Sequence, residues 1–157
     1  GPDLPVSDGM TSRRRSIYFH HSPSSQMDFL KVFDAADPTE AYTRHTSIVP
    51  HQALALFNSE LTLVQSRLLA RKLAAVNMDD KKFVEAAYEQ VLSRAVAANE
   101  AAVCTEFLKA QEAAFRADPS TLKNTTHGSL PSPNPRLRAR EKLVHALFNH
   151  HEFVTIR

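Results

Sequence analysis

The stretch SELTLVQSRLLARKLAAVNMDDKKFVEAAYEQVL, residues 59–92, decides the fold. Its first half carries apolar residues at three- and four-residue spacing, which predicts a helix over residues 59–75. Asp79 or Asp80 can then accept amide hydrogen bonds at the start of the next helix. A wide apolar stripe follows, made of Phe83, Val84, Ala87, Tyr88, Val91 and Leu92. The stretch therefore predicts two consecutive amphipathic helices.

Further helices are predicted on both sides of this stretch. Pro50 suits a first helical turn and starts a short helix over 50–57, which Asn58-Ser59 interrupts. After residue 92, Asn99 is the expected cap of a helix that ends near Asp118-Pro119, and a last helix is expected from Arg136 to Asn149. The chain has only three glycines and no tryptophan, which argues against Gly-rich sandwiches and phosphate loops.

These patterns predict an all-α fold, a helical bundle of about five helices with an irregular N-terminal layer packed on it. Early prolines interrupt any long helix in that layer, although 16–20, 29–33 and 39–45 remain candidates for short ordered pieces. We expect one helical domain over 1–157. It consists of an irregular layer at 1–46, a helical core at 47–117, a flexible loop at 118–135 and a C-terminal helix and tail at 136–157.

Composition excludes several classes of function. The 19 basic and 17 acidic residues leave a formal net charge of only +2, so Arg13 to Arg15 and the trio Arg136, Arg138 and Arg140 are weak hints of nucleic-acid binding. The single Cys104 rules out an internal disulfide and every multi-cysteine metal motif. No apolar run reaches the roughly 18 residues of a membrane span. Since the chain opens with GPDLP and no methionine, we expect a fragment of a longer protein.

Four pieces of the sequence carry a family resemblance that covers nearly the whole chain. The pieces are RRRSIYFHH, VFDAAD, RHTSIVPHQALALFNSELTLVQSRLLARKL and LVHALFNHHEFV. They resemble planctomycete-specific domain one, a C-terminal domain of unknown function found in large exported proteins that also carry planctomycetal cytochrome c domains. The resemblance implies an extracytoplasmic location, periplasmic or secreted, and a longer parent with a haem-bearing module. It transfers no catalytic residue.

The motif residues of this family are candidates for polar contacts that tie the N-terminal layer to the bundle. They are Arg14, Arg15, Tyr18, Asp34, Arg44, Gln52 and Asn58. A guanidinium can bind a carboxylate through two parallel hydrogen bonds, so we expect Arg14 or Arg15 to pair with Asp34. Gln52 is expected to satisfy backbone groups before Pro50, and Asn58 to break the helix before Ser59. A binding role for the same residues stays open.

No residue pattern predicts a catalytic or metal site. Covalent c-type haem needs Cys-x-x-Cys-His, which one cysteine cannot supply, and adjacent histidines point apart on a helix or strand. Non-covalent ligation near His145 to His150, or by His20 and His21, remains an alternative to surface or capping roles. Cys104 is expected to be a small buried thiol. We therefore expect no cofactor and no metal in this chain.

The leading functional hypothesis is a non-catalytic scaffold or docking module of an exported multidomain protein. Its expected partners are upstream domains of the same parent chain, including a haem-bearing module, and other exported proteins. The docking face is expected from apolar residues at both chain ends, namely Phe29, Leu30, Val32, Phe153, Val154 and Ile156. One alternative is an accessory subdomain of an extracytoplasmic enzyme acting on polysaccharide or sulfated substrates, which predicts a deep pocket gathering Arg14, Asp34, Arg44 and His45. The other is a nucleic-acid-binding module, which predicts salt-sensitive retention and which we do not favour.

Overall fold

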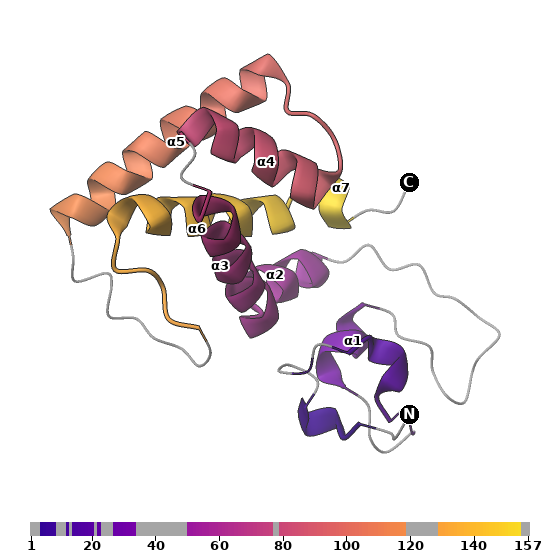
Figure 1. Cartoon of the computed structure of the whole chain (residues 1–157). Helices are drawn as coiled ribbons and strands as arrows, with labels where there is room; N and C mark the ends of the chain where they lie inside the picture. Colours follow the sequence, from indigo (N-terminus) through magenta and orange to yellow (C-terminus); the bar gives the residue numbers. More distant parts are fainter. Residues whose placement is uncertain are drawn as a thin grey trace. The chain divides into compact units, whose positions relative to one another are not determined.

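The structure is a computed structural model that describes residues 4–8, 12, 14–20, 22, 27–33, 50–76, 79–118 and 129–154. Over these ranges the chain forms seven α-helices and two short 3-10 helices, and its only β-type pairing is an isolated bridge between Leu4 and Phe19. The predicted all-α fold is confirmed (Figure 1). None of the described helices is both long and apolar enough to cross a membrane.

The elements are numbered in chain order. They are η1 (Val6–Asp8), η2 (Ser16–Tyr18), α1 (Asp28–Val32), α2 (Pro50–Asn58), α3 (Glu60–Ala74), α4 (Asp80–Leu92), α5 (Ala98–Ala117), α6 (Pro135–Phe148) and α7 (His151–Val154). The chain divides into two compact units, Gly1–Leu61 and Thr62–Arg157, so that the boundary falls within the first turn of α3. The expectation of one domain over residues 1–157 stays a prediction, because a division into compact units does not test it.

The first unit is built from short helical turns. Leu4 pairs with the segment after η2, because its amide donates to the Tyr18 carbonyl at 3.1 Å and its carbonyl accepts from the His20 amide at 3.1 Å. Phe19 and Met27 are buried, and α1 contacts α2. The brief apolar stretches at 16–20 and 29–33 thus form η2 and α1. The candidate piece at 39–45 lies outside the described residues.

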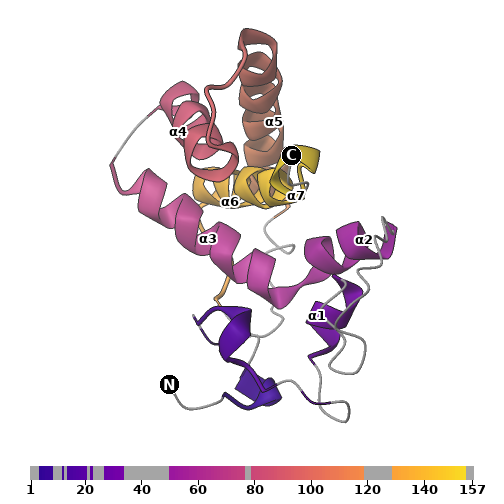
Figure 2. The same cartoon turned by 90° about the vertical axis from the view of Figure 1, so that its right-hand side faces the viewer.

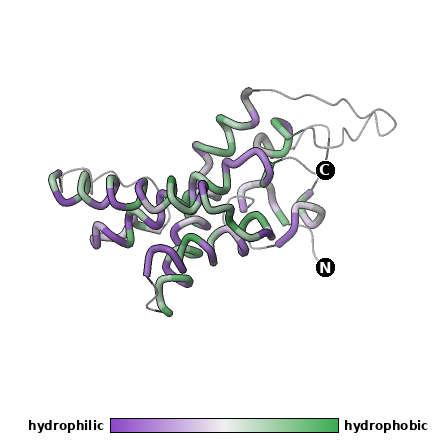
Figure 3. Tube along the Cα trace, turned by 90° about the horizontal axis from the view of Figure 1, so that it is seen from above, coloured by the Kyte–Doolittle hydropathy of each residue, from purple (hydrophilic) through white to green (hydrophobic). Residues whose placement is uncertain are grey.

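The second unit places one core between α4, α5 and α6, which contact one another in pairs (Figures 1 and 2). Hydrophilic and hydrophobic segments alternate along the helices in Figure 3, as amphipathic helices require. The buried cluster also takes one residue from α3. Its members are Ala70, Phe83, Val84, Ala87, Tyr88, Val91, Cys104, Leu108, Ala139, Leu143, Val144 and Leu147.

Helix termini in this unit show which sequence signals were decisive. The Asp79 carboxylate accepts from the Lys82 amide at 2.8 Å, so Asp79 caps α4 as one of the two predicted candidates. Asn134 accepts from the amides of Arg136 and Leu137, and Pro135 occupies the first turn of α6. The last helix therefore starts one residue before the predicted Arg136 and ends at Phe148, one residue before Asn149.

The predicted cap of α5 is wrong. Ala97, not Asn99, is the N-cap, and Asn99 lies inside the first helical turn. Ala97 has no side-chain acceptor, but its own amide donates to the Glu100 carboxylate at 2.9 Å. Glu100 thereby makes one of the two hydrogen bonds of a capping box, the one that its carboxylate accepts from the N-cap amide. The negative charge of this carboxylate also interacts favourably with the positive N-terminal end of the helix dipole. The start of α5 is therefore set by Glu100, three residues after Ala97, and not by the predicted cap Asn99.

Candidate functional site

Two of the predicted tethering residues lie outside the described part of the chain. Asp34 and Arg44 belong to that group, so the predicted pairing of Arg14 or Arg15 with Asp34 stays a prediction. Arg14 and Arg15 are exposed, and the Arg14 guanidinium carbon lies 5.8 Å from the centroid of the Tyr18 ring. This contact is a cation–π interaction within one segment.

The other two predicted residues lie on α2. Gln52 is half-buried near its start, and Asn58 is its exposed last residue. Ser59 follows between α2 and α3, and its buried hydroxyl donates to the Leu56 carbonyl at 3.2 Å. The helix break predicted at Asn58-Ser59 is therefore present, while the polar roles expected for Gln52 and Asn58 stay predictions.

Two arginines of α6 bind one carboxylate of α4. Oδ1 of Asp80 accepts from Arg140 Nη2 at 2.7 Å and from Arg136 Nη2 at 3.1 Å. Burial would raise the pKa of Asp80, but the hydrogen bonds from Arg140 and Arg136 outweigh it, and the pKa is lowered overall. The Arg140 guanidinium also lies 4.6 Å from the Phe83 ring centroid. These two members of the predicted basic cluster therefore join helices within the protein.

Arg94 connects three elements of the second unit. Its guanidinium donates to both carboxylate oxygens of Glu100 at 2.7 and 2.8 Å, and its Nε donates to Glu152 on α7 at 2.7 Å. The Arg94 hydrogen bonds, followed by that of the Ala97 amide, lower the pKa of Glu100 to about 2. Hydrogen bonds to Glu100 and Glu152 likewise raise the pKa of Arg94. This set of contacts fixes the connection from α4 to α5 and the position of α7.

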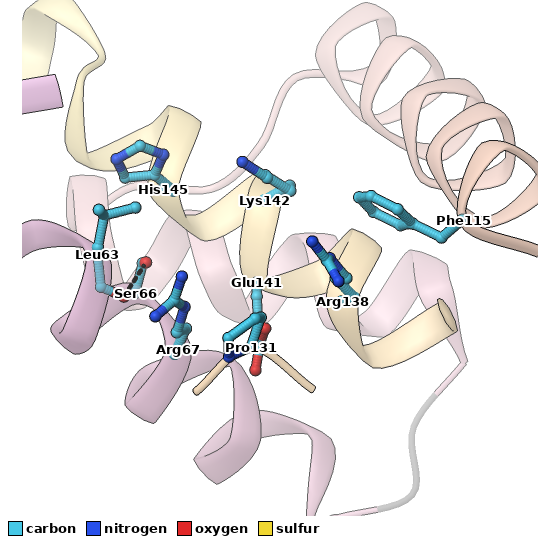
Figure 4. A pocket seen from close by; sticks show the side chains of 9 residues that line it. All are labelled: Leu63, Ser66, Arg67, Phe115, Pro131, Arg138, Glu141, Lys142 and His145. Carbon is cyan, nitrogen blue, oxygen red and sulfur yellow. Dashed lines mark hydrogen bonds between the residues drawn. The ribbon is translucent and has the colours of Figure 1, made fainter. Parts of the chain in front are cut away.

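A pocket of about 300 Å³ lies between α3, α5, α6 and the segment before α6 (Figure 4). Most of its charged side chains come from one stripe of α6, and α3 contributes an arginine opposite them. The lining residues are Leu63, Ser66, Arg67, Phe115, Pro131, Arg138, Glu141, Lys142 and His145. All of them belong to the second unit. We call this the cationic pocket.

The one acidic residue of the cationic pocket is already bound. Glu141 is buried, with Oε1 accepting from Arg71 Nε at 3.1 Å and Oε2 accepting from the Ser132 amide at 3.0 Å. Arg71 also donates to the hydroxyl of Ser129 and to the carbonyl of Leu130. Glu141 and Arg71 thus fix the segment 129–132 against α3 and α6, and the charge of Glu141 is matched by Arg71.

The remaining charged groups of the cationic pocket are positive. The Arg138 side chain is buried with its guanidinium carbon 4.7 Å from the Phe115 ring centroid. The half-buried Arg67 donates from Nη1 to the Ser129 carbonyl. Burial lowers the pKa of Arg67; Glu141 acts against this, while Arg71 and Arg138 lower it further. Although Lys142 as a residue is exposed, burial of its ammonium group lowers its pKa, and the charges of Arg138 and Arg67 add to that effect.

Two titratable groups of the core, those of Tyr88 and Cys104, lie close together. The Tyr88 hydroxyl and the Cys104 thiol lie 3.6 Å apart. Burial is the main cause that raises the pKa of both groups, and both therefore stay protonated near neutral pH. Cys104 is buried, as predicted. In the part of the chain that the structure describes, no three His, Cys, Asp or Glu residues gather as a metal site would require.

Sequence reasoning missed the cationic pocket, although one signal for it was present. Arg138, Glu141, Lys142 and His145 recur at spacings of three and four residues and so share a face of α6. Taken from the sequence alone, the basic residues of this helix give only a weak hint of nucleic-acid binding. The opposing Arg67 and the ring of Phe115 are far away in sequence, so only the tertiary fold reveals the pocket.

Comparison with known proteins gives a family but no function. No curated protein and no solved structure matches the chain significantly. The model of the PSD1 family, described as a protein of unknown function (DUF1553), matches residues 3–108, which is more than half of the chain. The match includes the motif residues from Arg14 to Asn58 and confirms the family resemblance drawn from them. The chain belongs to the PSD1 family of proteins of unknown function.

Proposed function

We propose that this chain is a non-catalytic helical module that docks a neighbouring domain of an exported multidomain protein. The observation that supports the proposal is an apolar ridge on α2, defined as Leu54 and Phe57, which lie almost one turn apart. Their exposed fractions are 59% and 49%. Large apolar side chains that stay exposed on one helical face are typical of interaction surfaces.

The polar groups of the second unit support a non-catalytic role. Asp80, Glu100 and Glu141 each accept hydrogen bonds from arginine side chains, which holds them in structural contacts. An acid–base catalyst needs a pKa near the working pH, whereas the pKa values of Asp80 and Glu100 are lowered. The buried thiol of Cys104 has a raised pKa, which disfavours a nucleophile.

The occupant that we propose for the apolar ridge is an upstream, haem-bearing domain of the same parent chain. The proposal draws on what the family resemblance implies, namely a longer exported parent protein that also carries cytochrome c domains. An extracytoplasmic location belongs to the same proposal. A few well-packed residues at the centre of an interface usually carry most of its binding energy, so we expect Phe57, with Leu54 beside it, to be the main contact.

The test is binding between this chain and the separately expressed upstream haem-bearing domain, measured by isothermal titration calorimetry. We expect the double variant Leu54→Asp, Phe57→Asp to bind at least about tenfold more weakly, because truncating a central contact typically costs about 2 kcal/mol. The matched control is Val103→Asp on α5, where the native side chain is 66% exposed. Equal affinity of all three proteins, or no binding of the unchanged chain, contradicts the proposal.

A further inference from the structure

We propose that the cationic pocket binds a tetrahedral oxyanion, sulfate or phosphate, either as the free ion or as the ester group of a small molecule. This inference goes beyond the docking proposal and rests on different residues, since the apolar ridge lies on α2 and the pocket lies between α3, α5 and α6. Three features of the pocket support it: the charge inside the pocket, the hydrogen-bond donors that remain available, and the pocket's size and lining.

The charge of the pocket is not balanced by its own residues. Arg67, Arg138 and Lys142 line it, and its only carboxylate, Glu141, is already paired with Arg71. Burial is the main cause that lowers the pKa of Arg67 and of Lys142, and repulsion from nearby guanidinium groups lowers both pKa values further. An anion among these three side chains would reverse that repulsion, and charges in a partly desolvated site interact more strongly than in bulk water.

Hydrogen-bond donors remain available for such an anion. Within the described part of the chain, the Lys142 ammonium makes no hydrogen bond and no ion pair, and Arg67 uses one of its three nitrogens, for Ser129. The Ser66 hydroxyl donates to the Leu63 carbonyl at 2.9 Å and is therefore already engaged. An ammonium group and a guanidinium fork are the two side chains that proteins use most to hold phosphate-like anions.

The number of cations favours a doubly charged anion such as sulfate or phosphate over a single carboxylate. Arg67 comes from α3, while Arg138 and Lys142 come from α6, so three positive side chains line the pocket from two helices (Figure 4). A volume of about 300 Å³ lies at the lower end for small-molecule sites and is too small for a polymer segment of any length. Leu63, Phe115 and Pro131 supply apolar lining, and Phe115 offers an aromatic ring that an ester substituent can contact.

The test is isothermal titration calorimetry of the full chain with sodium sulfate and sodium phosphate, with sodium chloride at matched ionic strength as reference. We expect saturable binding at one site, and Lys142→Met should weaken it about tenfold, since it removes one charge-assisted hydrogen bond. Lys82→Met, which removes an exposed lysine of α4 outside the pocket, should leave the affinity unchanged. No saturable binding, or the same loss in both variants, overturns the proposal.

Two further measurements separate the outcomes. The pKa of the Lys142 ammonium, followed by NMR, should rise when sulfate is added to the unchanged protein, and a constant pKa under saturating sulfate contradicts the assigned position. Phenyl phosphate compared with inorganic phosphate distinguishes the two sources of the anion. Tighter binding of the ester identifies a small-molecule site that uses the ring of Phe115, whereas equal affinity identifies a site for the ion itself.

Discussion

Single guanidinium groups organise much of the second unit. Arg94 binds Glu100 and Glu152 and also lies 5.3 Å from the Tyr88 ring centroid, so one side chain contacts α4, α5 and α7. Arg71, Arg136 and Arg140 act similarly towards Glu141 and Asp80. Because arginine presents several donors in a fixed plane, each can hold carboxylates from different helices in one geometry.

The Glu100 contact predicts a pH dependence of stability. Its pKa in the folded protein is about 2, lowered from 4.5, so the stabilisation is fully present above about pH 4.5 and is lost as the pH falls towards 2. Glu100→Gln should therefore have a lower Tm than the unchanged chain at pH 6. The two Tm values should converge as the pH falls towards 2, measured by differential scanning calorimetry.

The control for this prediction is Glu106→Gln, which changes an exposed carboxylate of the same helix. Its Tm should remain parallel to that of the unchanged chain across the range. A Tm difference for Glu100→Gln that stays constant between pH 6 and pH 2 contradicts the assignment of this acid-sensitive stabilisation to Glu100.

Residue roles were predictable where they depend on local sequence. Cys104 lies among alanines and Val103, and that setting was sufficient to predict a buried thiol. The partners of Arg138 and Arg140 could not be predicted, because Phe115 and Asp80 come from other helices. Nothing in the run of basic residues distinguishes an arginine that binds a distant carboxylate from one that binds a phosphate.

At the scale of elements, the start of each helix depends on which residue can place a hydrogen-bonding group against the first backbone amides. Asp79 and Asn134 both precede an apolar-periodic run, and both cap as the side-chain chemistry requires. Asn99 carries the same chemistry but lies two residues inside α5, whose start is set by the bond between Glu100 and the Ala97 amide. Arg94 reinforces that carboxylate from outside the helix, and no sequence window of one helix contains this information.

The end of α4 offers a prediction about stability. Ser93 caps this helix in the left-handed region, with φ of 55° and ψ of 31°, and it is the only non-glycine residue with positive φ in the described chain. A residue with a Cβ atom is disfavoured in that region by about 1 to 2 kcal/mol. Glycine at this position would remove that cost. Glycine also loses more conformational freedom on folding, which offsets roughly 0.4 to 1 kcal/mol of the stability gained.

Ser93→Gly should therefore raise the free energy of unfolding by about 0.5 to 1 kcal/mol. The measurement is urea unfolding followed by circular dichroism at 222 nm. Ser93→Ala is the matched comparison, because it removes the hydroxyl and keeps the Cβ atom, and it should give no such increase. If alanine stabilises as much as glycine, backbone strain at this position is not the cause.

At the scale of the whole molecule, periodicity was sufficient to predict the helices of the second unit. The predicted helices over 59–75 and 136–149 differ from α3 and α6 by one residue at each end. The apolar stripes of these helices predicted that they pack, but the stripes did not predict which helices they pack against. The pairing of α5 with α6 and the site that forms beside α3 depend on contacts between residues far apart in sequence, and a single sequence does not specify those contacts.

The limits of the family match lead to a prediction about which part of the chain folds alone. The match to residues 3–108 ends inside α5, yet the core cluster takes Ala139, Leu143, Val144 and Leu147 from α6. Burying a large aliphatic side chain is worth roughly 1.5 to 3 kcal/mol, and a whole domain is stable by only about 5 to 15 kcal/mol. Losing α6 therefore removes much of the available stability and exposes core residues of α4, such as Phe83 and Val84, to solvent.

We expect a fragment of residues 3–108 to show no cooperative urea transition, because its helices lack the surface on which they pack. A fragment of residues 60–157 contains α3 to α7 and every member of the core cluster, so it should unfold cooperatively with a midpoint near that of the full chain. Circular dichroism and tyrosine fluorescence from Tyr88 should report the same transition. A cooperative transition in the fragment 3–108 and none in the fragment 60–157 would place the stabilising contacts in the first unit instead.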